Sequence, residues 1–181
     1  MELIAEFKAS SLKFFRYYKQ LAEGAFAQLS DEQLHATSAP DGNSIAVIVQ
    51  HMAGNMHSRW DHFLISDGES ATRDRDLEFI DLFEPRDALM RRWEGGWAAL
   101  FAALEGLRDE DWTRSVTIRG EPLSVIEAVQ RQLSHYPHHV GQIVLLARQM
   151  RGASWQNLSV AKGQSAAYTA AVSEAARKME R

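Results

Sequence analysis

Apolar residues recur at three- and four-residue steps along four long stretches of the chain, and this spacing predicts four amphipathic helices. We place these helices at about residues 2–28, 44–65, 85–107 and 124–150. Trp60, Trp93 and Trp97 fall on the apolar stripes of the second and third helices, where they are most simply explained as core residues. We therefore expect an all-α fold, a four-helix bundle around one core.

Cap residues mark the starts of these helices. Ser30 is followed three residues later by Gln33, a capping-box spacing that predicts a short helical turn after the first helix. Pro85 opens the third helix, as proline does at a first helical position. Ser124 and Glu127 repeat the capping-box spacing at the start of the fourth helix.

Several segments depart from regular helical periodicity. Residues 67–79 are dense in charges of both signs, which predicts a loop held by its own ion pairs. Residues 116–123 alternate in polarity and predict a short extended hairpin, or an extended crossover, before the last long helix. Pro137 lies inside that helix and predicts a kink or a widened turn.

The length of 181 residues suits one domain with one substantial core, so we expect 1–181 to form a single domain. Residues 153–181 form a C-terminal extension that either packs on the bundle as a loop and a terminal helix or frays at its end. The net charge of −4 does not favour a nucleic-acid partner. The first eight residues are too charged for a signal peptide, and no later stretch is apolar for the length of a bilayer. We expect a cytoplasmic protein with no membrane partner.

The chain contains no cysteine. It therefore has no disulfide, no protein thiol nucleophile and no thiolate metal ligand. Any metal ion must be held by imidazole, carboxylate or amide groups.

The second predicted helix carries a polar stripe beside its apolar one. Steps of four, three and four residues place these side chains on one side of the helix: His51, Asn55, Ser58 and His62. A solvent-exposed face usually carries lysine and glutamate, whereas amides, hydroxyls and imidazoles together indicate a polar seam that faces something specific.

His135 and His139 lie one helical turn apart, about 6 Å along the axis, and project in nearly the same direction. Both can reach one ion at about 2.0–2.1 Å. We choose His51 as the third ligand, because it lies mid-helix in the polar seam. His138 points to a different side of its helix, and His62 lies three turns from His51, so we place both outside the ligand set.

The histidine pair has an alternative explanation. Two histidines at helical spacing often occur by chance, with hydrogen-bonded roles at a surface or in a core. Tyr136 follows His135 where zinc proteases carry the glutamate of His-Glu-x-x-His, so no general base is built into this motif.

Other polar residues are candidates for contact with a ligand. Asn55 and Gln142 either orient a metal ligand or contact substrate, or they bridge helices by side-chain hydrogen bonds. Glu69, Arg73 and Arg75 meet a polar substrate if their loop folds over the end of the bundle, and otherwise form a solvated loop with salt bridges.

Two sets of residues resemble motifs of a known superfamily. The first is His51-x-x-x-Asn55, followed by Ser58-Arg59-Trp60 and Asp67-Gly68-Glu69. The second is Arg131-Gln132-x-x-His135-x-x-x-His139-Val140-Gly141-Gln142-Ile143. Over about residues 1–165 the chain resembles the DinB-like, YfiT-like superfamily, and more closely one of its bacterial subfamilies of unknown function.

The resemblance implies a DinB-type bundle of up-and-down character with a long crossover, and frequent homodimers. It also implies a divalent ion, zinc or nickel, on three histidines, which by motif match are His51, His135 and His139. Arg59 and Glu69 lie in the matching motifs and are further candidates for contact with substrate or with the metal ligands.

The superfamily includes thiol-dependent transferases and isomerases, such as mycothiol-dependent maleylpyruvate isomerase, and proteins assigned as metal-dependent hydrolases. The resemblance therefore implies an enzyme whose metal ion activates either a low-molecular-weight thiol or water toward a small-molecule substrate. The thiol would be a cosubstrate, because the chain has no cysteine. The alternative is a non-catalytic, dimeric helical bundle that binds a metal or a ligand.

Overall fold

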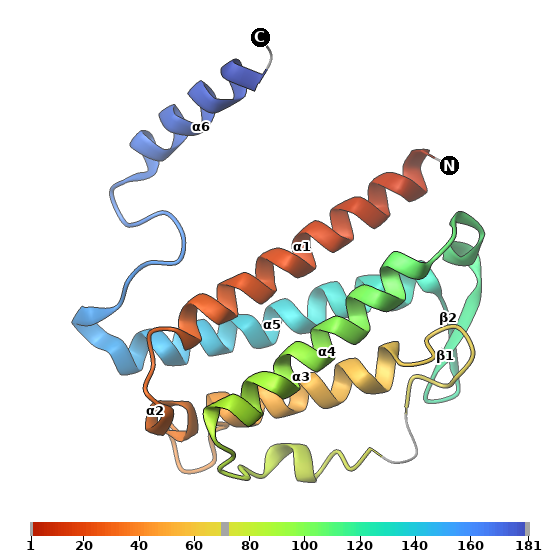
Figure 1. The fold of residues 1–181 in the computed structure, drawn as a ribbon, viewed down its shortest axis with the longest axis horizontal. Helices are drawn as coiled ribbons and strands as arrows, with labels where there is room; N and C mark the ends of the chain where they lie inside the picture. Colours follow the sequence, from red (N-terminus) through yellow and green to blue (C-terminus); the bar gives the residue numbers. More distant parts are fainter. Residues whose placement is uncertain (1, 70–72, 180–181) are drawn as a thin grey trace.

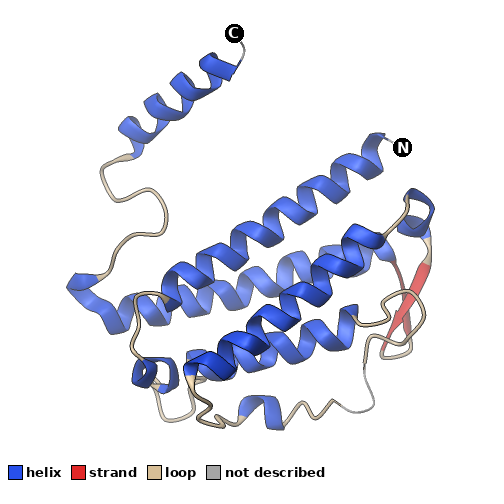
Figure 2. Ribbon diagram, viewed as in Figure 1, coloured by secondary structure: helices blue, strands red, loops and turns tan. Residues whose placement is uncertain are grey.

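The computed structural model describes residues 2–69 and 73–179 (Figure 1). Its long helices are α1 (Glu2–Phe26), α3 (Ile45–Trp60), α4 (Arg86–Gly106) and α5 (Val125–Arg151). The shorter helices are α2 (Asp31–His35), α6 (Ser165–Met179) and the 3-10 helices η1 (Leu77–Phe79), η2 (Asp109–Thr113) and η3 (Gly152–Ser154). The strands β1 (Ser115–Ile118) and β2 (Glu121–Ser124) form an antiparallel hairpin just before α5 (Figure 2). The predicted all-α fold and its hairpin are confirmed.

The predicted caps are also confirmed. Ser30 with Gln33, and Ser124 with Glu127, form complete capping boxes at α2 and α5. Pro85 stands at the start of α4 as predicted, but it is the N-cap, one residue before the first helical position. The helix α5 continues through Pro137, so the proline does not end it.

The second helix is shorter than predicted, so the prediction that His62 belongs to the polar seam is wrong. It ends at Trp60 instead of residue 65, and His62 lies beyond it with a φ of 56°. The chain turns here because the next residues pair with the hairpin, where Gly68 N donates to Thr117 O at 2.8 Å. His62 therefore does not extend the row of polar residues on α3.

The four long helices are arranged as two pairs that run in opposite directions (Figure 1). Helices α1 and α5 run one way and pack against each other, and α3 and α4 run the other way and also pack together. Because α3 and α4 are parallel, the connection between them must return along the bundle, and its described residues 73–85 do so; this connection is the long crossover. Its 3-10 helix η1 lies against α3.

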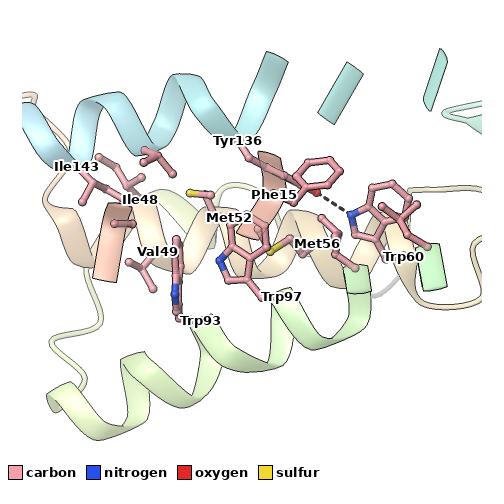
Figure 3. Close-up of a cluster of buried hydrophobic side chains, with 14 of the residues drawn as sticks. Phe15, Ile48, Val49, Met52, Met56, Trp60, Trp93, Trp97, Tyr136 and Ile143 are labelled. Atoms are coloured by element: carbon pink, nitrogen blue, oxygen red, sulfur yellow. Dashed lines mark hydrogen bonds between the residues drawn. The ribbon is translucent and has the colours of Figure 1, made fainter. Parts of the chain in front are cut away.

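The core lies between the four helices and is rich in aromatic residues (Figure 3). Trp97 packs edge-on against Phe15 and Tyr136, with ring centroids 6.3 and 5.8 Å apart. Tyr136 is fully buried, and its hydroxyl accepts a hydrogen bond from Trp60 Nε1 at 3.0 Å. Burial of these large rings supplies much of the driving force for folding.

The C-terminal extension docks at its start and then leaves the bundle. Gln28, in the turn that follows α1, exchanges two hydrogen bonds with the backbone of Gln156, at 2.8 and 3.0 Å. Helix α6 forms, but it stands away from the four long helices (Figure 1). Among the described residues, no helix combines the length and apolar character needed to cross a membrane.

Asp111 is the capping acid of η2, between α4 and the hairpin. It accepts hydrogen bonds from Arg108 N and from the Arg114 side chain, each at 3.0 Å. The backbone hydrogen bond from Arg108, with the Arg108 and Arg114 side chains, lowers the pKa of Asp111 to about 2. Because this value lies below that of the unfolded chain, the carboxylate stabilises the fold above about pH 4, and that contribution is lost as the pH falls towards 2.

We predict that Asp111→Asn lowers the urea midpoint at pH 7, and that the deficit narrows as the pH falls below about 4. Asp109→Asn is the control, since Asp109 is an exposed aspartate in the same turn. Urea denaturation followed by circular dichroism at several pH values measures both. If the urea midpoint of Asp111→Asn stays below that of wild type by the same amount down to pH 2.5, the lowered pKa of Asp111 is contradicted.

Candidate metal centre

Helices α3 and α5 bring three histidines together. One ring nitrogen from each of His51, His135 and His139 lies within 4.8 Å of the others. The Nε2 atoms of His135 and His139 are 3.1 Å apart, as expected for residues one helical turn apart. The predicted convergence is confirmed, and the binding of an ion stays a prediction.

Each of these imidazoles has its other nitrogen held by a side-chain oxygen. The Nδ1 pairs are His51 with Glu78 at 3.0 Å, His135 with Gln132 at 3.3 Å and His139 with Gln142 at 2.8 Å. Carboxylate and amide oxygens only accept hydrogen bonds, so each Nδ1 carries the ring proton and donates it. Each Nε2 atom therefore carries no proton and has a free lone pair, and an imidazole binds a metal ion in this form.

The close approach of two lone pairs is unfavourable unless a cation lies between them. Burial, together with the positive charges that His139 and His51 would carry, lowers the pKa of His135 to about 3. Burial also lowers the pKa of His139, so both rings are neutral at neutral pH and share no proton. Two nitrogens bound tetrahedrally to one zinc ion at about 2.05 Å lie about 3.3 Å apart. The residues present thus fit a divalent cation.

Glu78 reaches His51 from the crossover. Gln50, the residue before His51 on α3, donates through Nε2 to the carbonyl oxygens of Leu77 and Ile80, at 2.8 and 3.1 Å. The two acceptor residues lie on either side of Glu78 in the chain, so these hydrogen bonds hold η1 against α3. The position of the carboxylate is therefore set by tertiary contacts.

A buried ion pair keeps Glu78 charged. Arg73 Nε and Nη2 donate to its two carboxylate oxygens at 2.6 and 2.7 Å, and both side chains are buried. Burial opposes ionisation, but the hydrogen bonds from Arg73 and His51 outweigh it and lower the pKa of Glu78. This pair confirms that the charged segment 67–79 is held by ion pairs of its own; residues 70–72 of that segment lie outside the described residues.

Asn55 is oriented by hydrogen bonds that begin in the core. The hydroxyl of Tyr136 accepts from Trp60 and donates to Asn55 Oδ1 at 3.1 Å. Burial raises the pKa of Tyr136, so this hydroxyl keeps its proton. Asn55 therefore does bridge two helices, and within the described hydrogen bonds its amide N–H groups are left for a ligand.

Of the remaining predicted residues, one contacts a histidine of the cluster and two contact each other. Gln142 orients His139, as one of the two alternatives predicted. Arg59 is buried and contacts Glu69, with Nη2 3.4 Å from Oε2. Glu69 also accepts from Arg119 Nε at 2.7 Å, and within the described part of the chain it forms no hydrogen bond or ion pair with the three histidines.

The three histidines line a cavity of about 660 Å³, together with Asn55, Arg59 and His138. A larger cavity of about 1010 Å³ lies beside α3 and is bordered by Glu78, Gly54 and His62. The larger cavity includes none of the three clustered histidines, so the smaller one is the candidate site. Within the described residues, His62 and His138 stay outside the cluster, as predicted.

Sequence reasoning missed two of the residues that orient the rings. Gln132 lies three residues before His135, and this helical spacing was a usable signal. Glu78 gave no such signal, because it lies 27 residues from His51 in a segment without periodicity.

Comparison with known proteins places the chain in a family. A family model described as "Protein of unknown function (DUF1572)" matches residues 3–164. The chain belongs to the DUF1572 family. No curated protein matches it.

The fold of this DUF1572 protein is similar to that of a DinB-like protein from Bacillus cereus ATCC 10987, known from a crystal structure. The TM-score is 0.58 at 19% sequence identity, and the match covers 77% of this chain and 90% of that chain. At this identity the comparison shows the fold alone, and it confirms the DinB-like bundle that the sequence motifs predicted.

We predict that the DUF1572 protein takes up about one equivalent of zinc or nickel per chain. Inductively coupled plasma mass spectrometry of protein purified without nickel resin or chelator, followed by zinc titration, measures this uptake. His135→Ala removes one of three ligands and should weaken binding at least about a hundredfold. His57→Ala is the control, because His57 is exposed on the same helix as His51. Less than about a tenth of an equivalent, with no uptake on titration, would exclude the metal centre.

We also predict that Gly54→Ala weakens zinc binding about 10- to 100-fold, the usual effect of disturbing a group that orients a metal ligand. A Cβ at Gly54 would overlap Glu78 Oε1 and lie 2.8 Å from its Cδ, so the carboxylate must leave the position in which it accepts from His51.

Gly141→Ala is the matched control for this substitution. It is a helical glycine whose Cβ would meet open space within the described structure. It should leave zinc affinity unchanged and stabilise α5 by up to about 1 kcal/mol. Equal zinc affinities for Gly54→Ala and the wild type would show that Glu78 does not support the centre.

Proposed function

We propose that this DUF1572 protein is a metal-dependent enzyme in which His51, His135 and His139 hold one divalent ion, zinc or nickel. The observation that carries the proposal is the trio of imidazoles, each with Nδ1 bound to a side-chain oxygen and Nε2 left for a metal. Three histidine ligands are typical of catalytic sites, in which a further position is open to water or substrate.

The chemistry that the ion supplies when bound is Lewis acidity, which lowers the pKa of a coordinated thiol or water molecule and provides a nucleophile at neutral pH. The chain's own residues orient the site. Glu78, Gln132 and Gln142 hold the three rings, and Asn55 offers amide N–H donors to a substrate.

Of the two candidate reactions, we favour thiol transfer over hydrolysis. The wall of the 660 Å³ cavity, among the described residues, contains no carboxylate that could act as a general base on water. A thiol has a pKa of about 8.5 and loses its proton far more readily than water does. Since the chain has no cysteine, the thiol would be a low-molecular-weight cosubstrate. Homodimer formation stays a prediction.

A turnover screen tests the proposal. Zinc-loaded protein is assayed with small thiols against electrophiles, and with panels of esters and amides in the absence of thiol. We expect thiol-dependent product formation that falls at least about a hundredfold in His135→Ala, with circular dichroism showing that the variant is folded.

Two other results would redirect the assignment. Turnover of an ester or amide without thiol, equally sensitive to His135→Ala, would assign the hydrolase reaction. If metal-loaded protein gives no turnover in either panel and His51→Ala only lowers the melting temperature, the protein is a non-catalytic binding module and the enzyme proposal fails.

A further inference from the structure

Four arginines line the cavity into which the three histidines open. They come from four different parts of the fold: Arg59 from α3, Arg75 from the crossover, Arg119 from the hairpin and Arg131 from α5. No aspartate or glutamate lines this cavity within the described residues. The wall is therefore strongly positive, although the whole chain has a net charge of −4.

The charges of these arginines are only partly neutralised by the protein. Arg59 and Arg119 share one carboxylate, that of Glu69. Arg75 and Arg131 are exposed and form no ion pair with any described residue. Two guanidinium groups beside the histidines are thus available to an incoming ligand.

Arg59 adds a buried positive charge to the same wall. It is 4% exposed, and its Nε and Nη1 have no hydrogen-bond partner among the described residues. Buried donors without partners are costly, and such groups in native proteins usually indicate a role or a bound species.

Arg119 is held at the cavity in a conformation that arginine rarely adopts. It lies at the tip of the hairpin with a φ of 58°, in the left-handed region that favours glycine or asparagine. Asp67 fixes the tip by accepting from the backbone N–H groups of Arg119 and Gly120, at 2.8 and 2.7 Å. Local strain maintained by tertiary contacts is frequent at ligand sites.

We infer that the substrate of this site is a small anion, one that carries a carboxylate or a phosphate group held by Arg75 and Arg131 beside the three histidines. Guanidinium groups bind both kinds of anion through paired N–H donors. A cavity of about 660 Å³ has the size of a small-molecule site. The net negative charge of the chain argues against an extended polyanion such as nucleic acid. This inference rests on the proposed function, because it concerns the substrate of the same centre.

Isothermal titration calorimetry tests the inference with three probes: inorganic phosphate, succinate and succinamide, the neutral analogue of succinate. Each probe is titrated into metal-free and zinc-loaded protein. We expect phosphate or succinate to bind wild type and succinamide not to bind. In the double variant Arg75→Gln/Arg131→Gln, the affinity for the anion should fall about tenfold or more in both forms.

Arg148→Gln is the matched control, because Arg148 is an exposed arginine further along the same helix α5 and should leave anion affinity within about twofold of wild type. Arg131→Lys, which keeps the charge, should retain part of the affinity. Stronger binding of phosphate indicates a phosphorylated substrate, and stronger binding of succinate indicates a carboxylate.

The inference is overturned if wild type binds neither anion, or if the double variant binds them as wild type does. Zinc uptake is measured on the same samples. Anion binding without zinc uptake would overturn the proposed metal chemistry and leave the arginine site. Zinc uptake without arginine-dependent anion binding would overturn the arginine site and leave the metal centre.

Discussion

The candidate centre depends on three hydrogen bonds that fix where the protons on three imidazole rings lie. Glu78, Gln132 and Gln142 each accept from an Nδ1 atom, so the opposite nitrogens are lone pairs. A neutral histidine in a different tautomer would present an N–H group to the same space and could not bind a cation there. Burial reinforces the arrangement, because it lowers the pKa of His135 and disfavours the imidazolium form.

Glu78, one of these three acceptors, lies in the irregular crossover between α3 and α4. Several residues fix its position. Gln50 holds η1 against α3, Arg73 neutralises Glu78, and Gly54 leaves room for the carboxylate. Removing one partner of a buried ion pair typically costs about 3–5 kcal/mol. The crossover is therefore structurally tied to the centre, and the parallel direction of α3 and α4 is what brings it there.

The surroundings of the centre combine two kinds of recognition. Neutral imidazoles are suited to a cation, while the arginines of the same wall are suited to an anion. These preferences are compatible in one site, since a substrate anion beside a bound cation is attracted by both the ion and the guanidinium groups. Among the described residues this wall carries no carboxylate, and for this reason our proposal favours a thiol, whose pKa is low, over water as the nucleophile.

Much of the fold followed from local patterns. Helical spacing and capping boxes predicted the long helices, because side-chain direction and backbone hydrogen bonding there depend on near neighbours. The same spacing paired His135 with His139, and the polar stripe singled out His51, a choice that the motif resemblance supported. The end of α3 was misplaced by five residues because contact with the hairpin stops it at Trp60. Glu78 and the arginine-lined wall were decided by tertiary structure alone, since loop charges have no periodicity and only packing sets which distant groups meet.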